Sequence, residues 1–184
     1  MQSEKEIILA CLQNNREAQK LLYKTFAAKM HGICYRFAQK NNQAEDILQE
    51  GFIRVFKNLG KFKFQGSFEG WVKRIIINAA IDYIKKYGMH FQEINEETTE
   101  QCDIVEDEAT SNLSVEYLME LIKSLPDSKR VIFNLYAYEG YSHKEIAEKL
   151  NITVSTSKSQ YCKARKMLQE QLINIKNKSY ERVN

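Results

Sequence analysis

The sequence is poor in the residues that interrupt and turn a chain. Its 184 residues include a single proline, Pro126, and only seven glycines, which is little punctuation for a protein built from many short strands. Hydrophobic residues nevertheless make up 43% of the chain, enough to form buried cores and to argue against global disorder. Scarce turn residues together with ample apolar content predict an all-α protein.

Long apolar runs are missing as well. No stretch of eighteen consecutive apolar residues occurs, so no membrane insertion is expected. The N-terminal residues MQSEKEII lack a basic segment followed by an apolar one, and a secretory signal is not expected either. The four cysteines stand far apart without a C-x-x-C pair, and only three histidines accompany them, which argues against a metal site. These absences indicate a cytoplasmic protein.

Basic residues are absent from one continuous part of the chain. Residues 88–122 contain ten acidic residues and no lysine or arginine, a net charge of −10. Residues 1–87 hold fifteen basic and eight acidic residues (+7), and residues 123–184 hold twelve and six (+6). Two basic units on either side of an acidic segment favour a protein whose two ends each meet a polyanion.

The acidic segment also separates two regions of helical periodicity. Residues 89–112 lack such periodicity and are rich in acidic and polar side chains, which favours a flexible acidic linker. We therefore predict two small helical domains, residues 1–88 and 113–184, joined by that linker. The first is expected to begin at a capping box, Ser3-x-x-Glu6, whose side chains bond the free N–H groups of a helix end.

Two further helices are expected in the first domain, one from Gln43 and a long one capped by Ser67. Between them, the segment GKFKFQG (residues 60–66) is predicted to be a loop with two exposed phenylalanines. Apolar residues recur at helical spacing in both helices. The expected inner faces comprise Leu48, Phe52, Val55, Phe56 and Leu59 in the first helix, and Phe68, Trp71, Val72, Ile75 and Ala79 in the second.

The second domain contains the pattern of a helix-turn-helix. Ser142-x-x-Glu145 is another capping box. Asn151 suits the left-handed conformation that ends a helix, and Thr153 can cap the next helix. The second helix is expected to point small polar and basic residues outward, where they suit phosphates and base edges, although an ordinary helical hairpin would also show a solvated face. The expected outward residues are Ser155, Thr156, Lys158, Ser159, Gln160, Lys163 and Lys166, and the inward ones are Val154, Ser157, Tyr161, Ala164 and Leu168.

Residues 125–168 (LPDSKRVIFNLYAYEGYSHKEIAEKLNITVSTSKSQYCKARKML) resemble the C-terminal DNA-binding domain of extracytoplasmic-function (ECF) sigma factors of the sigma-70 family. The sequence departs from the family wording at Ser155, where glycine is usual, and at Gln160, where arginine is usual. The resemblance implies that this domain binds the −35 promoter element as duplex. The implied contacts are Ser155, Thr156, Lys158, Ser159, Gln160 and Lys163.

Residues 44–59 (AEDILQEGFIRVFKNL) resemble the helix with which sigma factors grip the clamp helices of the largest RNA polymerase subunit. A polar stripe lies opposite the apolar face of this predicted helix. A solvated outer face is the alternative, because any amphipathic helix shows one. The implied polymerase-binding residues are Asp46, Gln49, Glu50 and Arg54.

Residues 66–86 (GSFEGWVKRIIINAAIDYIKK) resemble the segment that, with the loop before it, reads the −10 element and holds the opened strand. Capturing a single strand requires basic residues together with aromatic or pocket residues that receive unstacked bases. The implied −10 contacts are Phe62, Phe64, Gln65, Ser67, Arg74, Asn78, Asp82, Lys85 and Lys86.

The resemblance as a whole implies an alternative sigma factor that directs bacterial RNA polymerase to specific promoters. It implies clamp-helix docking, −10 melting and −35 recognition, without catalytic residues, a metal or a cofactor of its own. The implied partners are core RNA polymerase, promoter DNA and an anti-sigma factor. In the holoenzyme the linker would follow the RNA path, whereas the charge distribution suggests that it could instead cover the DNA-binding faces of the free protein.

Two other function classes compete with this interpretation. A two-component activator has a similar helix-turn-helix but also an α/β receiver domain, and no strand-rich half is predicted here. A small helical nuclease would need clustered carboxylates or histidines, whereas the acidic residues concentrate in the predicted linker.

Overall fold

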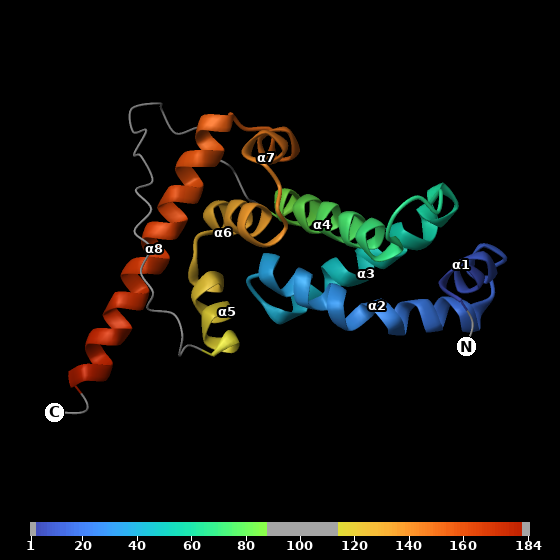
Figure 1. Cartoon of the computed structure of the whole chain (residues 1–184), viewed down its shortest axis with the longest axis horizontal. Helices are drawn as coiled ribbons and strands as arrows, with labels where there is room; N and C mark the ends of the chain where they lie inside the picture. Colours follow the sequence, from blue (N-terminus) through green and yellow to red (C-terminus); the bar gives the residue numbers. More distant parts are fainter. Residues whose placement is uncertain (1–2, 88–113, 182–184) are drawn as a thin grey trace. The chain divides into compact units, whose positions relative to one another are not determined.

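The computed structural model describes residues 3–87 and 114–181, and within these two stretches every regular element is helical (Figure 1). The chain divides into two compact units, residues 1–88 and 89–184. The all-α prediction is confirmed for the described residues, and no strand of a receiver domain occurs among them. The predicted linker, residues 89–112, lies outside these ranges.

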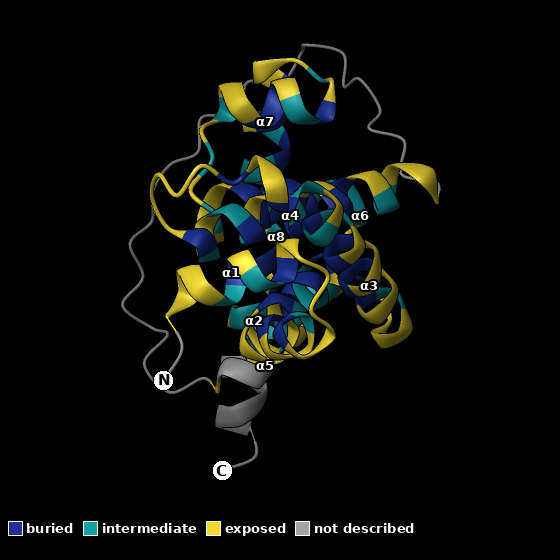
Figure 2. Ribbon diagram, turned by 90° about the vertical axis from the view of Figure 1, so that its right-hand side faces the viewer, coloured by how far each residue is buried: buried dark blue, intermediate teal, exposed yellow. Residues whose placement is uncertain are grey.

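The described part of the first unit consists of α-helices and one 3-10 turn. Their bounds are α1 (Glu4–Leu12), α2 (Arg16–Phe37), α3 (Asn41–Asn58) and α4 (Phe68–Lys86), with a 3-10 turn, η1 (Leu59–Lys61), after α3. Helix α3 packs against both α2 and α4, while α1 packs against α2 and η1. The dark blue residues of Figure 2 mark the buried side of each helix. The largest fully buried side chains of this unit are Phe37, Phe68, Ile8, Leu22, Met30, Ile47, Leu59, Ile76 and Ile77.

Helix starts in this unit follow local side-chain chemistry. Ser3 Oγ accepts from the N–H of Glu6 at 3.2 Å, and Glu6 Oε2 accepts from the N–H of Ser3 at 2.8 Å, which confirms the first capping box. Asn14 has a φ of +59°, and the next residue, Asn15, caps α2 by accepting from two backbone N–H groups. Ser67 caps α4 as predicted. Short polar side chains therefore fix where these helices begin.

Helix α4 buries a wider face than the sequence predicted. Trp71 and Ile75, expected inside, are half-buried, whereas Ile76 and Ile77 are buried. The reason is that α4 packs against two helices, α2 and α3, rather than one. A close approach at Gly51 accompanies this packing, because a Cβ added there would lie 2.4 Å from Ile76 Cδ1.

The second unit contains α5 (Val115–Ser124), α6 (Asp127–Phe133), a π-helical turn η2 (Asn134–Tyr138), α7 (His143–Leu150) and α8 (Val154–Glu181). Helices α5, α6 and α7 each pack against α8. Helix α6 continues into this π-helical turn, and Gly140 follows shortly after with a φ of +74°. One core cluster joins α5 to α8 and comprises Leu121, Ile122, Leu125, Ala164 and Leu168.

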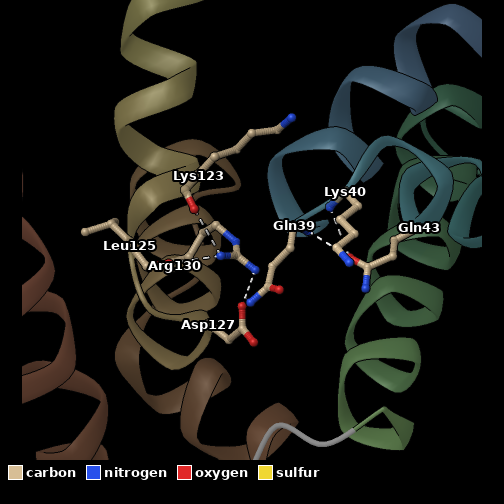
Figure 3. A network of polar contacts seen from close by, with 7 residues as sticks. All are labelled: Gln39, Lys40, Gln43, Lys123, Leu125, Asp127 and Arg130. Atoms are coloured by element: carbon tan, nitrogen blue, oxygen red, sulfur yellow. Dashed lines mark hydrogen bonds and ion pairs between the residues drawn. The ribbon is translucent and has the colours of Figure 1, made fainter.

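A buried arginine fixes the connection between α5 and α6. The side chain of Arg130 is 1% exposed, and its Nη1 donates to the carbonyl oxygens of Leu125 at 2.9 Å and Lys123 at 3.3 Å (Figure 3). Its other terminal nitrogen pairs with Asp127. Carbonyl groups at the end of a helix have no partner within the helix, so Arg130 satisfies the end of α5 and holds α6 at a fixed angle to it.

Candidate functional site

The polar stripe predicted on α3 is present on the surface of the first unit. Asp46, Gln49 and Glu50 are exposed, and Arg54 is half-buried, with a third of its side chain exposed. Arg54 Nε donates to Glu50 Oε1 at 2.9 Å, one turn earlier on the same helix. Two members of the stripe, Glu50 and Arg54, are therefore joined by an ion pair.

The five α4 residues that the family resemblance assigns to the −10 element are all exposed. Four of them recur every three to four residues and share one face of the helix; together with the adjacent Lys86 they are called the α4 stripe. None of them belongs to the buried core. The residues are Arg74, Asn78, Asp82, Lys85 and Lys86.

The structure joins these two stripes, which the sequence treated as separate. Arg54 Nη1 lies 2.5 Å from Asp82 Oδ2, and Tyr83 Oη donates to Asp46 Oδ2 at 3.2 Å. Hydrogen bonds to Asp82 and then to Glu50 raise the pKa of Arg54. Burial, followed by the hydrogen bond to Asp46, raises the pKa of Tyr83. These two contacts join the polar residues of α3 to those of α4.

Tyr83, which bonds Asp46, was not among the site residues predicted from the sequence. It neighbours Asp82 in the chain, but a tyrosine in an amphipathic helix carries no signal of its own. The contact of Tyr83 with Asp46 depends on how α3 and α4 cross. The periodicity of a single helix does not predict where two helices cross.

The loop before α4 differs from its prediction at one residue. Phe62 was expected to be exposed, but it is 8% exposed, so that expectation is wrong. Its ring centroid lies 5.0 Å from that of Phe68 and 5.5 Å from that of Trp71. Packing of the Phe62 ring against these two rings stabilises its buried position. Phe64 is 42% exposed as predicted, and Gln65 and Ser67 are exposed as well.

The turn chemistry of the helix-turn-helix is confirmed in the second unit. Ser142 and Glu145 form the predicted capping box at the start of α7. Asn151 ends α7 with a φ of +57°. Thr153 Oγ1 accepts from the N–H of Thr156 at 3.0 Å, which is the predicted cap of α8.

The outer face of α8 is only partly as predicted. Ser155 and Lys158 are exposed, and Ser159 and Lys163 are half-buried. Thr156 and Gln160 were expected outside but are 5% and 6% exposed.

The orientation predicted for Thr156 and Gln160 is therefore wrong. Thr156 turns inward because its hydroxyl bonds that of Thr153 at 2.9 Å. Val154, assigned inward for its apolar side chain, is 41% exposed. In the first turns of α8, local hydrogen bonding and the position of α7 decide the buried face rather than apolarity.

A stacked histidine ties the two helices of this motif together. His143 Nδ1 lies 3.0 Å from Ser157 Oγ of α8, and its ring stacks on Tyr136 with centroids 4.3 Å apart. Burial, followed by the charge of Lys158, lowers the pKa of His143. No role was predicted for His143, because a histidine one residue after a helix cap is typical of an ordinary surface residue.

Within residues 3–87 and 114–181, no group of three His, Cys, Asp or Glu side chains is arranged to hold a metal ion. In the same residues no helix is both long enough and apolar enough to cross a membrane.

Comparison with known proteins matches each of the two units to a protein family. The Sigma-70 region 2 family matches residues 22–88, and the Sigma-70 region 4 family matches residues 115–168. The ECF RNA polymerase sigma factor SigW of Bacillus subtilis is 33% identical over 158 residues, covering 80% of this chain and 84% of SigW. The ECF RNA polymerase sigma-E factor of Haemophilus influenzae is 26% identical over 171 residues, covering 87% of this chain and 90% of that protein.

A solved structure shares the fold. The sigma factor RpoE, in its complex with the anti-sigma factor NepR from Bartonella quintana, has a TM-score of 0.53 to this chain at 20% identity. The match covers 85% of this chain and 96% of RpoE. From the two matching families and the identity to SigW, the chain belongs to the extracytoplasmic-function sigma factors of the sigma-70 family, which are non-catalytic factors of promoter-specific transcription initiation.

Proposed function

We propose that this sigma factor works through three surfaces: one that docks on core RNA polymerase, one that reads and opens the −10 element, and one that binds the −35 element as duplex. The observation that carries the proposal is the ion pair between Arg54 and Asp82. It joins a docking stripe on α3 to a DNA stripe on α4. Polymerase binding and strand opening would then act on the same rigid pair of helices.

The docking surface comprises the exposed residues of α3, with Arg54 held between two carboxylates. Charged side chains that are fixed in position lose little conformational freedom when they bind. A clamp helix with complementary charge is the partner that such a surface fits. The proposed docking residues are Asp46, Gln49, Glu50 and Arg54.

The −10 surface combines the α4 stripe with the loop before it. Arg74, Lys85 and Lys86 supply positive charge for the DNA backbone, and Phe64 supplies an exposed ring on which an unstacked base could stack. Gln65, Ser67 and Asn78 add hydrogen-bonding groups. In this proposal Phe62 packs beneath the loop, against Phe64, Phe68 and Trp71, and does not contact DNA.

The −35 surface is the outer side of α8. Lys158 and Lys163 would neutralise phosphates, while Ser155 and Ser159 can approach phosphates or base edges in the major groove. The proposed surface leaves out Thr156 and Gln160, because their side chains are 5% and 6% exposed.

Footprinting of the reconstituted holoenzyme tests whether separate surfaces open the −10 element and bind the −35 element. At a promoter that the holoenzyme uses, permanganate should modify thymines at −10 only when the chain is present. DNase protection at −35 should be lost in a Lys158→Ala/Lys163→Ala variant that still opens −10 on a strong promoter. Loss of −10 opening together with −35 protection in this variant would contradict the assignment of the two activities to separate surfaces.

We propose an anti-sigma factor as a further partner. The support is that RpoE, the structural relative, was solved with NepR bound. A protein that copurifies with this chain from its own cells should suppress transcription by the reconstituted holoenzyme. A copurifying protein without that effect would not be an anti-sigma factor.

A further inference from the structure

The exposed ring of Phe64 is held in an uncommon backbone conformation. Phe64 has a φ of +56°, in the left-handed region that bulky residues rarely occupy. Such conformations persist only where the surrounding structure determines them. The ring of Phe62, 5.1 Å away, lies beneath it, and Phe62 is itself packed among buried rings. The loop conformation therefore holds the ring of Phe64 in its exposed position.

Helix α1 touches this loop at two places. The ammonium of Lys5 lies over the ring of Phe64, with Nζ 5.7 Å from the centroid. Leu12 Cδ2 lies 3.7 Å from the position that a Cβ on Gly60 would take, at the start of the loop. Helix α1 ends before residue 22, where the Sigma-70 region 2 match begins. The contact to Phe64 thus comes from a part of the chain to which the family match assigns nothing.

We infer that Lys5 is an additional contact for the opened DNA strand and acts together with Phe64. This inference rests on the proposed role of the loop in holding that strand. In the free protein the exposed ammonium occupies the ring of Phe64 by a cation–π contact. When a base stacks on the ring, the ammonium moves aside and meets the phosphate of the same nucleotide.

The order of interaction strengths supports this exchange. A cation–π contact at an exposed site is weaker than the stacking of a base on an aromatic side chain. A base therefore displaces the ammonium from the ring. The displaced ammonium can still contact DNA, because Lys5 has a flexible four-carbon stem that lets it reach the phosphate beside the stacked base. A nucleotide thereby gains both a stacking platform and a positive charge.

The test measures how salt affects binding of single-stranded DNA. The holoenzyme is titrated against a short fluorescein-labelled DNA single strand of mixed sequence, because stacking tolerates any base, and core polymerase alone supplies the baseline. Lys5→Met keeps the length of the side chain and removes its charge. Loss of one phosphate contact should reduce the slope of log affinity against log salt by about 0.7.

Three variants make the result specific. Lys5→Arg should retain the slope of the unmodified protein, and Lys20→Met, which removes a charge from an exposed position of α2, should retain it too. Phe64→Ala should weaken single-strand binding by about ten-fold or more and leave duplex binding unchanged. Helix content by circular dichroism checks that each variant is folded.

The outcomes separate the inference from the function on which it rests. An unchanged salt slope in Lys5→Met, while Phe64→Ala weakens binding, would overturn the role of Lys5 alone. Unchanged single-strand binding in Phe64→Ala would overturn the role of the loop. Equal losses for Lys5→Met and Lys20→Met would reduce Lys5 to a contribution of general charge and also overturn the inference.

Discussion

Arg54 of α3 and Asp82 of α4 form an ion pair across 28 positions of the sequence, with Nη1 2.5 Å from Oδ2. The pair is half-exposed, with 33% and 56% of the two side chains accessible. It joins the proposed docking surface to the proposed −10 surface, and it contributes little to stability, because exposed ion pairs do so.

The first prediction concerns the energetic worth of this pair. A double-mutant cycle with Arg54→Ala and Asp82→Asn should give a coupling of about 0.5–1 kcal/mol in the free energy of unfolding. Urea denaturation of the single and double variants measures it. A coupling indistinguishable from zero would mean that the two stripes are adjacent but not connected.

The second prediction concerns the docking surface. The variant Asp46→Lys/Glu50→Lys should weaken binding of core polymerase by about 2 kcal/mol or more if these residues lie at the centre of the interface. Its fold should lose no more than about 1 kcal/mol, because the contacts removed are exposed. The control Glu4→Lys/Glu17→Lys makes the same charge change at exposed positions of α1 and α2. Equal affinity of both double variants for core polymerase would remove Asp46 and Glu50 from the interface.

The third prediction concerns the crossing of α3 and α4. Gly51→Ala should lower the free energy of unfolding by about 1–3 kcal/mol through overpacking, because the new Cβ would lie 2.4 Å from Ile76 Cδ1. Gly32→Ala, in α2, has nothing within 4 Å and should stabilise by about 0.5–1 kcal/mol. Adding Ile76→Val, which deletes the clashing methyl group, should recover part of the loss. A Gly51→Ala variant as stable as Gly32→Ala would show that the crossing is not tight.

The fourth prediction concerns DNA binding by α8. Lys158→Ala should lower affinity for −35 duplex evenly across sequences and reduce the salt slope by about 0.9, one phosphate contact. Gln160→Met should leave the preferred −35 sequence unchanged, because Gln160 is buried. Titrations of −35 duplex at several salt concentrations measure the slope for Lys158→Ala, and selection of binding sites from a randomised duplex measures the preferred sequence for Gln160→Met. A new preferred sequence with Gln160→Met would contradict the buried position.

The fifth prediction concerns pH. Burial and Lys158 lower the pKa of His143 below its ordinary value of 6.5, so between the two values the unfolded chain binds more protons than the folded one. The stabilisation is complete above the unfolded pKa of 6.5 and is lost as pH falls through the lower folded value. The thermal midpoint of the second unit should therefore drop on acidification, and less so in His143→Gln. An identical decline in both proteins would remove His143 from the cause.

Local signals in the sequence were enough to predict most of the fold. Ser3, Ser67, Ser142 and Asn151 act on backbone groups within a few residues of themselves, so their roles hold whatever surrounds them. Periodicity likewise predicted the apolar inner face of α3, of which Leu48, Phe52, Val55 and Leu59 are buried. The family resemblance then supplied a function that these local signals do not contain.

The errors occurred where two helices or two rings meet. Phe62 is buried by Phe68 and Trp71, and Gln160 is buried because of how α8 packs, and neither fact is contained in the period of one helix. The ion pair of Arg54 and the contact of Lys5 with Phe64 are likewise properties of packing. Sequence patterns thus predicted which polar residues of α3 lie on the surface but not the contacts that join them to α4.

Run-off transcription tests the central claim most directly. Core RNA polymerase is incubated with fragments of the genome that encodes this chain, with and without the protein, and the RNA 5′ ends are mapped. The account predicts discrete start sites that appear only with the protein and share one pair of −10 and −35 sequences. They should disappear with Asp46→Lys/Glu50→Lys and persist with Glu4→Lys/Glu17→Lys. Start sites that are the same with and without the protein would contradict its role as a promoter-specific sigma factor.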